Sequence, residues 1–170
     1  MAAMTSDASD ARGTSIWRSV PPKLRTDREV VIAAVTKSCS LNEIPETFRN
    51  DRGVVMTAII CDTTAFQHAP DHMRDDKEIV MTAVTRHGGE LDYASARMRG
   101  DEDVVMAAVT QAGYALKYAS KDMRNNKKVV MAAVAQYNKA FVFASAELQA
   151  DDDVRSLMHI RGSHKYIMYL

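Results

Sequence analysis

Residues 101–125 read DEDVVMAAVTQAGYALKYASKDMRN, and this stretch decides the fold because near-copies of it fill most of the chain. Asp101 can accept hydrogen bonds from the free N–H groups of a helix's first turn. Apolar residues follow at helical spacing. Gly113 predicts the end of this helix, since glycine tolerates the left-handed conformation common at helix C-termini. Leu116 to Met123 then predict a second, shorter helix.

Copies of the unit start at regular intervals. Their first residues are 24, 25, 25, 25 and 25 positions apart, at Asp27, Asp51, Asp76, Asp101, Asn126 and Asp151. A fixed period of this kind, built from units that cannot bury their apolar faces alone, is typical of a solenoid. We therefore predict an all-α fold, a right- or left-curved α-solenoid of about five 25-residue helix-turn-helix repeats with partial caps.

The repeat also predicts how the chain is divided. Residues 1–15 are small and polar and are expected to form a flexible N-terminal tail. In the segment after them, Trp17 takes the place of Leu116 and is expected in the core. The remaining segments are an N-terminal cap half-repeat at 16–26, repeats at 27–50, 51–75, 76–100, 101–125 and 126–150, and a C-terminal cap with an apolar tail at 151–170.

Units of the form D-x-x-V-V-[ML]-x-A-V, a small turn and L-x-Y-A-S, followed by a hydrophobic residue, Arg and Asp, resemble the tandem helical repeats of the family called domain of unknown function 4116. The resemblance covers roughly residues 16–154. The first two copies depart from the pattern, because Pro45 and Pro70 stand where later copies have Ser95 and its equivalents. That family has no established activity, so the resemblance implies a fold and no site residue.

The composition narrows the function classes. The chain has 170 residues, with 22 basic and 22 acidic side chains. A zero net charge argues against bulk electrostatic attraction to nucleic acid or an anionic membrane. No apolar stretch reaches the length of a membrane span. Residues 1–15 lack the apolar region of a secretory signal and contain acidic residues. We expect a cytoplasmic protein, with an organelle left open if the chain is a processed product.

No combination of residues predicts catalysis or cofactor binding. The sequence contains no phosphate-binding glycine loop, nucleophile elbow or H-E-x-x-H motif. His68 and His72 have the spacing of two zinc ligands on a helix, but no third ligand is near them in the sequence. Cys39 and Cys61 form no C-x-x-C pair. We therefore expect no enzyme activity, no cofactor and no metal site.

The leading hypothesis for function is a non-catalytic protein–protein interaction or scaffold module, for example a small accessory subunit of a larger complex. Stacked helical repeats expose extended surfaces of the kind that bind other proteins. The partner would be another protein or a multi-subunit assembly. The apolar C-terminal residues either fold back on the last repeat or dock on another chain, and the candidate partner-binding residues among them are Tyr166, Met168, Tyr169 and Leu170.

An alternative hypothesis concerns a column of arginines that recurs once per repeat, at Arg25, Arg49, Arg74, Arg99 and Arg124. In a structural interpretation these side chains cap helices and pair with the acidic residue that starts the next unit. In a functional interpretation they bind phosphates of nucleic acid or of a phosphorylated partner, because the guanidinium fork matches phosphate. Arg74, Arg99 and Arg124 are the candidate binding residues of this second interpretation.

Overall fold

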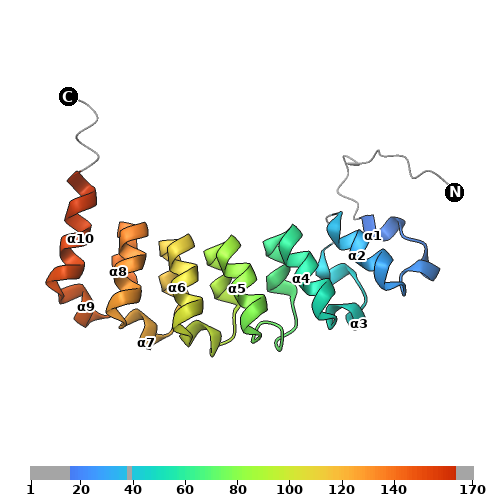
Figure 1. Cartoon of the computed structure of the whole chain (residues 1–170), viewed down its shortest axis with the longest axis horizontal. Coiled ribbons are helices and arrows are strands. Elements are labelled where there is room, and N and C mark those ends of the chain that lie inside the picture. The colour runs from blue at the N-terminus through green and yellow to red at the C-terminus, as the bar shows by residue number, and fades with distance from the viewer. Residues whose placement is uncertain (1–15, 38–39, 164–170) are drawn as a thin grey trace, which may run out of the picture.

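The computed structural model describes residues 16–37 and 40–163, with the backbone alone for 159–163, and every element in these ranges is a helix. The six longer helices after the N-terminal cap lie side by side in chain order, and each contacts the next (Figure 1). They are α2 (Arg28–Thr36), α4 (Arg52–Cys61), α5 (Lys77–Arg86), α6 (Glu102–Gln111), α8 (Lys127–Gln136) and α10 (Asp152–Ser163).

The second half of each unit differs from the single short helix that the sequence predicts. In the unit at 101–125 it is a 3-10 helix, η6 (Gly113–Tyr118), followed by a separate one-turn helix, α7 (Lys121–Arg124). The remaining short elements are α1 (Ile16–Ser19), η1 (Pro22–Leu24), η2 (Leu41–Glu43), α3 (Glu46–Arg49), η3 (Thr63–His68), η4 (Gly88–Tyr93), η5 (Met98–Gly100), η7 (Asn138–Phe143) and α9 (Ala146–Ala150).

Hydrogen bonding between units explains the break. The backbone N–H of Ser120 donates to the carbonyl oxygen of Arg99 in the preceding unit at 2.8 Å. The Ser120 hydroxyl accepts from the Met123 N–H and so starts α7 as its N-cap. Ser95 and Ser145 make the equivalent backbone bonds to Arg74 and Arg124. The serine of the L-x-Y-A-S motif therefore joins adjacent units instead of continuing a helix.

The core runs along the row between the long helices and the short elements. Helix α6 buries Val104, Val105, Ala108 and Val109, and Leu116 from η6 is fully buried against it. Trp17 is 6% exposed, which confirms its predicted core position. No helix in the described ranges is long and apolar enough to cross a membrane, since the longest of them has 12 residues.

Gly113 has a different role from the predicted left-handed one. It does not adopt a positive φ, and the residue before it, the α6 C-cap Ala112, is extended with φ −148°. A Cβ atom on Gly113 would lie 2.4 Å from the carbonyl oxygen of Ala133 in the next unit. A Cβ atom on Gly88 would likewise lie 2.3 Å from the carbonyl oxygen of Ala108. The missing side chain lets the turns at Gly88 and Gly113 press closely against the next helix, whereas Thr63 and Asn138 hold the equivalent position in two other units.

Two glutamines fix the units at these contacts. The side-chain oxygen of Gln111 accepts from the Gly88 N–H at 2.6 Å, and its NH₂ group donates to the Arg86 carbonyl oxygen at 3.3 Å. Gln136 repeats the arrangement one unit later, with Gly113 at 2.6 Å and Gln111 at 3.4 Å. Each amide thus satisfies one buried donor and one helix-terminal acceptor of the preceding unit.

The six acidic or Asn residues that start the units are helix N-caps, as predicted. Asp51 accepts from the backbone N–H groups of Gly53 and Val54 at 2.9 and 3.1 Å. The same pair of hydrogen bonds is accepted by Asp27, Asp76, Asp101, Asn126 and Asp151. Capping of this kind contributes about 1 kcal/mol per helix.

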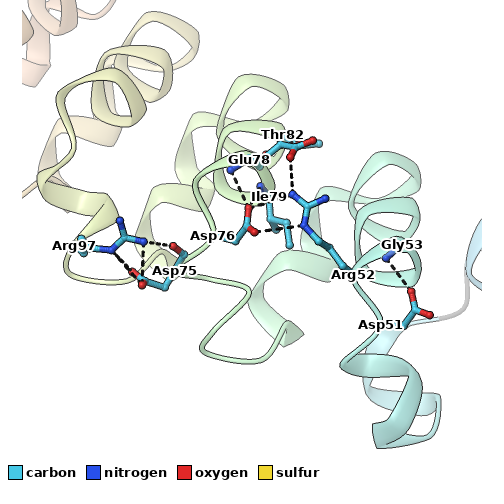
Figure 2. Close-up of polar contacts among 9 residues, drawn as sticks. All are labelled: Asp51, Arg52, Gly53, Asp75, Asp76, Glu78, Ile79, Thr82 and Arg97. Carbon is cyan, nitrogen blue, oxygen red and sulfur yellow. Dashed lines mark hydrogen bonds and ion pairs between the residues drawn. The ribbon is translucent and has the colours of Figure 1, made fainter.

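The five N-caps after Asp27 also contact a side chain from the preceding unit, and we call this series of contacts the charge ladder. Arg28 lies 2.7 Å from Asp51. Arg52 reaches Asp76 and Glu78 at 3.4 and 2.6 Å (Figure 2). Lysines continue the series as Lys77 with Asp101 and Asp103, and Lys127 with Asp151 and Asp153. Because the ladder links N-terminus to N-terminus, the long helices are parallel.

One step of the ladder has the opposite polarity. Glu102 occupies the position that holds a cation in the units before and after it, and it accepts from Lys128 at 2.9 Å. The N-cap facing Glu102 is Asn126, whose amide NH₂ donates to it at 3.2 Å. An Asp at 126 would place two carboxylates together, so the change from Asp to Asn follows from the charge of Glu102.

The close approach at Gly113 gives the first test. We expect Gly113→Ala to destabilise the protein by about 1–3 kcal/mol, because the new methyl group meets backbone that cannot move aside. Gly100→Ala is the matched control, since its nearest neighbour is the Ser120 hydroxyl at 3.7 Å, and it should change stability by less than about 0.5 kcal/mol. Urea denaturation measures both. Equal effects would contradict the assigned role of Gly113.

The ladder gives a second test. The hydrogen bond from Arg28 is the main cause that lowers the pKa of Asp51 from its ordinary 3.8 to about 2. A lowered pKa contributes stability that is present above pH 3.8 and is lost as the pH falls toward 2. NMR titration of the Asp51 carboxyl should show this pKa, and Arg28→Gln should raise it toward the ordinary value. An unchanged pKa in that variant would exclude the contact in solution.

Candidate interaction surfaces

The outward side of the long helices carries a continuous uncharged surface, which we call the methionine face. It consists of three residues from each of α2, α4, α5, α6 and α8. They form three rows: Ile32, Met56, Met81, Met106 and Met131; Ala33, Thr57, Thr82, Ala107 and Ala132; and Thr36, Ile60, Thr85, Thr110 and Ala135. The three positions i, i+1 and i+4 share one side of a helix. Because neighbouring helices are parallel, the rows line up.

The side chains of the methionine face are partly accessible. Ile32 and the four methionines are half-buried and pack against the core from outside. Ile60 is 50% exposed. The hydroxyls of four threonines donate within their own helices, at Thr36, Thr57, Thr82 and Thr85, with distances between 2.7 and 2.9 Å. The polar groups of the surface are thus largely satisfied, and its contact area is mainly methyl and thioether.

A groove crosses this face between α5 and α6. It is lined by Thr85, Met106, Ala107, Thr110 and Gln111 and has a volume of about 420 Å³. The charge ladder lies at the N-terminal end of the helices (Figure 2). At the opposite end of the helices lies another row of residues, which consists of Lys37, Cys61, Arg86, Gln111 and Gln136. The methionine face is therefore an apolar band between two polar borders.

The arginine column does not pair with the acidic N-caps, so the predicted ladder of arginines and aspartates is wrong. Those aspartates bind the cations of the charge ladder instead. The side chains of Arg49, Arg99 and Arg124 make no hydrogen bond or ion pair with any described residue. Their Nε atoms, like that of Arg74, are buried without a partner. Only Arg74 has a carboxylate, that of the exposed Asp71.

Two of these arginines line open grooves between adjacent units. Arg49 lies with Glu46, Asn50, His68 and Pro70 around a groove of about 210 Å³. Arg124 lies in a second groove with a different set of neighbours, of about 260 Å³. Arg25, at the N-terminal end of the column, is used structurally: its Nε donates to the Val20 carbonyl oxygen at 2.9 Å and its guanidinium lies over the Trp17 ring.

The other predicted site residues, Tyr166, Met168, Tyr169 and Leu170, lie outside the described residues. Among the residues that the structure does describe, no three or more His, Cys, Asp or Glu side chains gather as a metal site would require. His68 and His72 are both exposed.

A buried carboxylate was missed by the sequence interpretation. Glu90 is 4% exposed and stands where other units have the buried alanines Ala65, Ala115 and Ala140. Its carboxylate oxygen Oε1 lies 3.2 Å from Nδ1 of His87, whose Nε2 lies 3.2 Å from the Tyr114 hydroxyl. The second oxygen, Oε2, is buried and unpaired. A single acidic residue in an alanine column was the available signal.

Burial raises the pKa of Glu90 above its ordinary value, against the smaller opposing effect of His87. A raised pKa contributes stability that is present below the ordinary 4.5 and is lost as the pH rises through the folded-state pKa. None of Glu90, His87 and Tyr114 lines one of the grooves above. We therefore regard this cluster as a pH-dependent element of stability.

The variant Glu90→Gln tests this assignment. We expect it to be more stable than the parent chain at pH 7–8, where the parent must hold a buried charge, and to show little difference near pH 4, where Glu90 is protonated. Denaturation in urea at a series of pH values gives the comparison. Gln at the exposed Glu147 is a control that should leave the profile unchanged. A stability difference that is the same at all pH values would show that folding does not change the pKa of Glu90, and would contradict the assignment.

Comparison with known proteins identifies a family and no relative of known function. The sequence model described as "Domain of unknown function (DUF4116)" matches three times in tandem, at residues 27–74, 51–99 and 101–149. Searches of the curated proteins and of the solved structures return no match.

Proposed function

Because the chain belongs to the DUF4116 family of tandem helical repeats, we propose that it is an α-solenoid of five repeats that serves as a non-catalytic protein interaction module. In this proposal the methionine face binds a segment of a partner protein, and the chain acts as a scaffold or accessory subunit. The observation that carries the proposal is the extent of this face, which crosses five helices without one charged residue.

The chemistry of the face supports a protein ligand. Monomeric proteins rarely expose contiguous apolar patches of this kind unless they bind something. Methionine side chains are flexible and polarizable, so they adapt to the shape of an apolar partner and are used at such surfaces. The groove between α5 and α6 offers a recess for an apolar side chain. A helix or extended segment with an uncharged apolar stripe would match it.

The parallel stacking of the units supports the same proposal. The N-caps and the charge ladder hold the helices through contacts at their N-terminal ends, and Gln111 and Gln136 hold the opposite ends of α5, α6 and α8. A partner would therefore meet a surface that is largely preformed, which lowers the entropic cost of binding.

We test the proposal with one charge placed in the middle of the face. In Met106→Lys the ammonium group would have to be desolvated by an apolar partner, so captured protein should fall at least tenfold. Capture from native extract is carried out at about 0.5 M salt, where contacts between exposed charges are screened. Thermal unfolding verifies that the variant is folded, which we expect because lysine can extend its charge into solvent.

Val142→Lys is the matched control, because Val142 is 65% exposed but lies in η7, outside the methionine face. It should retain the same partners as the parent chain. The proposal is contradicted if both variants capture the same proteins in the same amounts, or if the parent chain captures none.

The alternative of a phosphate-binding stripe is supported by one observation, the buried and unpaired Nε atoms of the arginine column. The neighbours of the column argue against a uniform stripe for a nucleic acid. In two units the residue three positions before the arginine is acidic: Glu46 precedes Arg49, and Asp71 precedes Arg74. A polyanion would meet repulsion there, so we place this function second.

A further inference from the structure

The groove at Arg124 differs in charge from the groove at Arg49, which is lined by one acid, Glu46. It is formed between the units at 101–125 and 126–150, and it is lined by Lys121, Arg124, Phe143, Ala144 and Ser145. Two of these five side chains are cations and none is an acid. The corresponding position three residues before the arginine is Glu46, Asp71 and Ala96 in the three preceding units.

Both cations are available for a ligand. Neither Lys121 nor Arg124 makes a side-chain hydrogen bond or ion pair with the described residues. Arg124 is half-buried and its Nε is shielded from water without a partner. A buried donor without a partner costs free energy, so an acceptor bound in the groove would remove that cost.

The rest of the groove is already hydrogen-bonded. The Ser145 hydroxyl lies 2.5 Å from Oδ1 of Asn125, and it accepts from the Leu148 N–H. The Ser145 N–H donates to the Arg124 carbonyl oxygen at 2.9 Å, which fixes the backbone that carries the guanidinium. Recognition would therefore depend on the two cations, with Phe143 providing an apolar wall.

We propose that this groove binds a phosphate monoester through Lys121 and Arg124. A guanidinium presents two parallel donors that match two phosphate oxygens, and an ammonium group adds a point charge. The volume of about 260 Å³ holds such a group together with part of the carrier that bears it. The carrier is a small molecule or a phosphorylated side chain of a protein, since both present the same group. The site is independent of the methionine face.

The test is a titration of ¹⁵N-labelled protein followed by amide NMR shifts at residues 121–124 and 143–145. Inorganic phosphate, O-phosphoserine and O-phosphotyrosine are the probes. We expect saturable shifts with a Kd on the order of 1 mM for phosphate. Tighter binding of phosphotyrosine than of phosphate would show that Phe143 contacts the carrier, and tighter binding of phosphoserine alone would favour a peptide source.

Two variants test the assigned residues. Arg124→Gln should weaken binding by about tenfold or more, because it removes a charge-assisted hydrogen bond. Lys121→Ala should weaken it by several-fold and, as an exposed site, should leave folding unchanged. Binding should also strengthen between pH 5 and 7.5, since the second ionisation of a phosphate monoester lies near pH 6.

A gain of function is a further test that does not depend on destabilising variants. Ala96→Lys places a second cation three residues before Arg99, whose guanidinium is also unpaired. It should create a second saturable set of shifts, at residues 96–99 and 118–120. Unchanged affinity in Arg124→Gln, shifts that do not saturate, or no new site in Ala96→Lys would each overturn the proposal.

Discussion

The structure depends on one joint that recurs at the start of each unit. A side-chain oxygen of the first residue accepts two backbone N–H groups of its own helix, and in most units the same carboxylate accepts from a cation of the unit before it. One residue thus starts a helix and aligns it with its neighbour. The hydrogen bonds are local, while the ion pairs span 23 to 26 residues. Each unit is therefore positioned by the preceding one, as in repeat proteins in which each unit contacts only its neighbours.

Much of this architecture could be predicted, because the same sequence pattern recurs in successive units. Helix starts, the apolar core positions and the burial of Trp17 follow from capping and periodicity within one unit. The break in the second helix could not be predicted from one unit. The Ser120 N–H has a partner within reach in the preceding unit, and sequence periodicity carries no information about that partner. The role of Gly113 was misassigned for the same reason, since its constraint is the Ala133 carbonyl of the next unit.

The candidate surfaces show where sequence reasoning had limits. A methionine in a run such as VVMAAV is naturally assigned to the core with its neighbours. In the structure the helix turns its valines and Ala108 toward the neighbouring units, and Met106 lies half-buried at the edge of that core. The structural interpretation of the arginine column paired it with the N-caps two residues on, yet the first residues of α2, α4, α5 and α8 take those carboxylates. The arginines lack carboxylate partners at the N-caps because those carboxylates accept from the cations at the start of the preceding long helix.

Departures from the repeat are therefore more informative about function than the repeat itself. Positions that recur, such as the N-caps and the buried valines, are explained by stacking alone. Asn126 departs from the acidic N-caps, and the ladder explains it through Glu102. Lys121 departs from Glu46 and Asp71, and no described residue pairs with it. A unit that needed only to stack would gain nothing from a second unpaired cation beside Arg124. An anion in that groove would stabilise both side chains, which is why the departure points to a ligand and not to the fold.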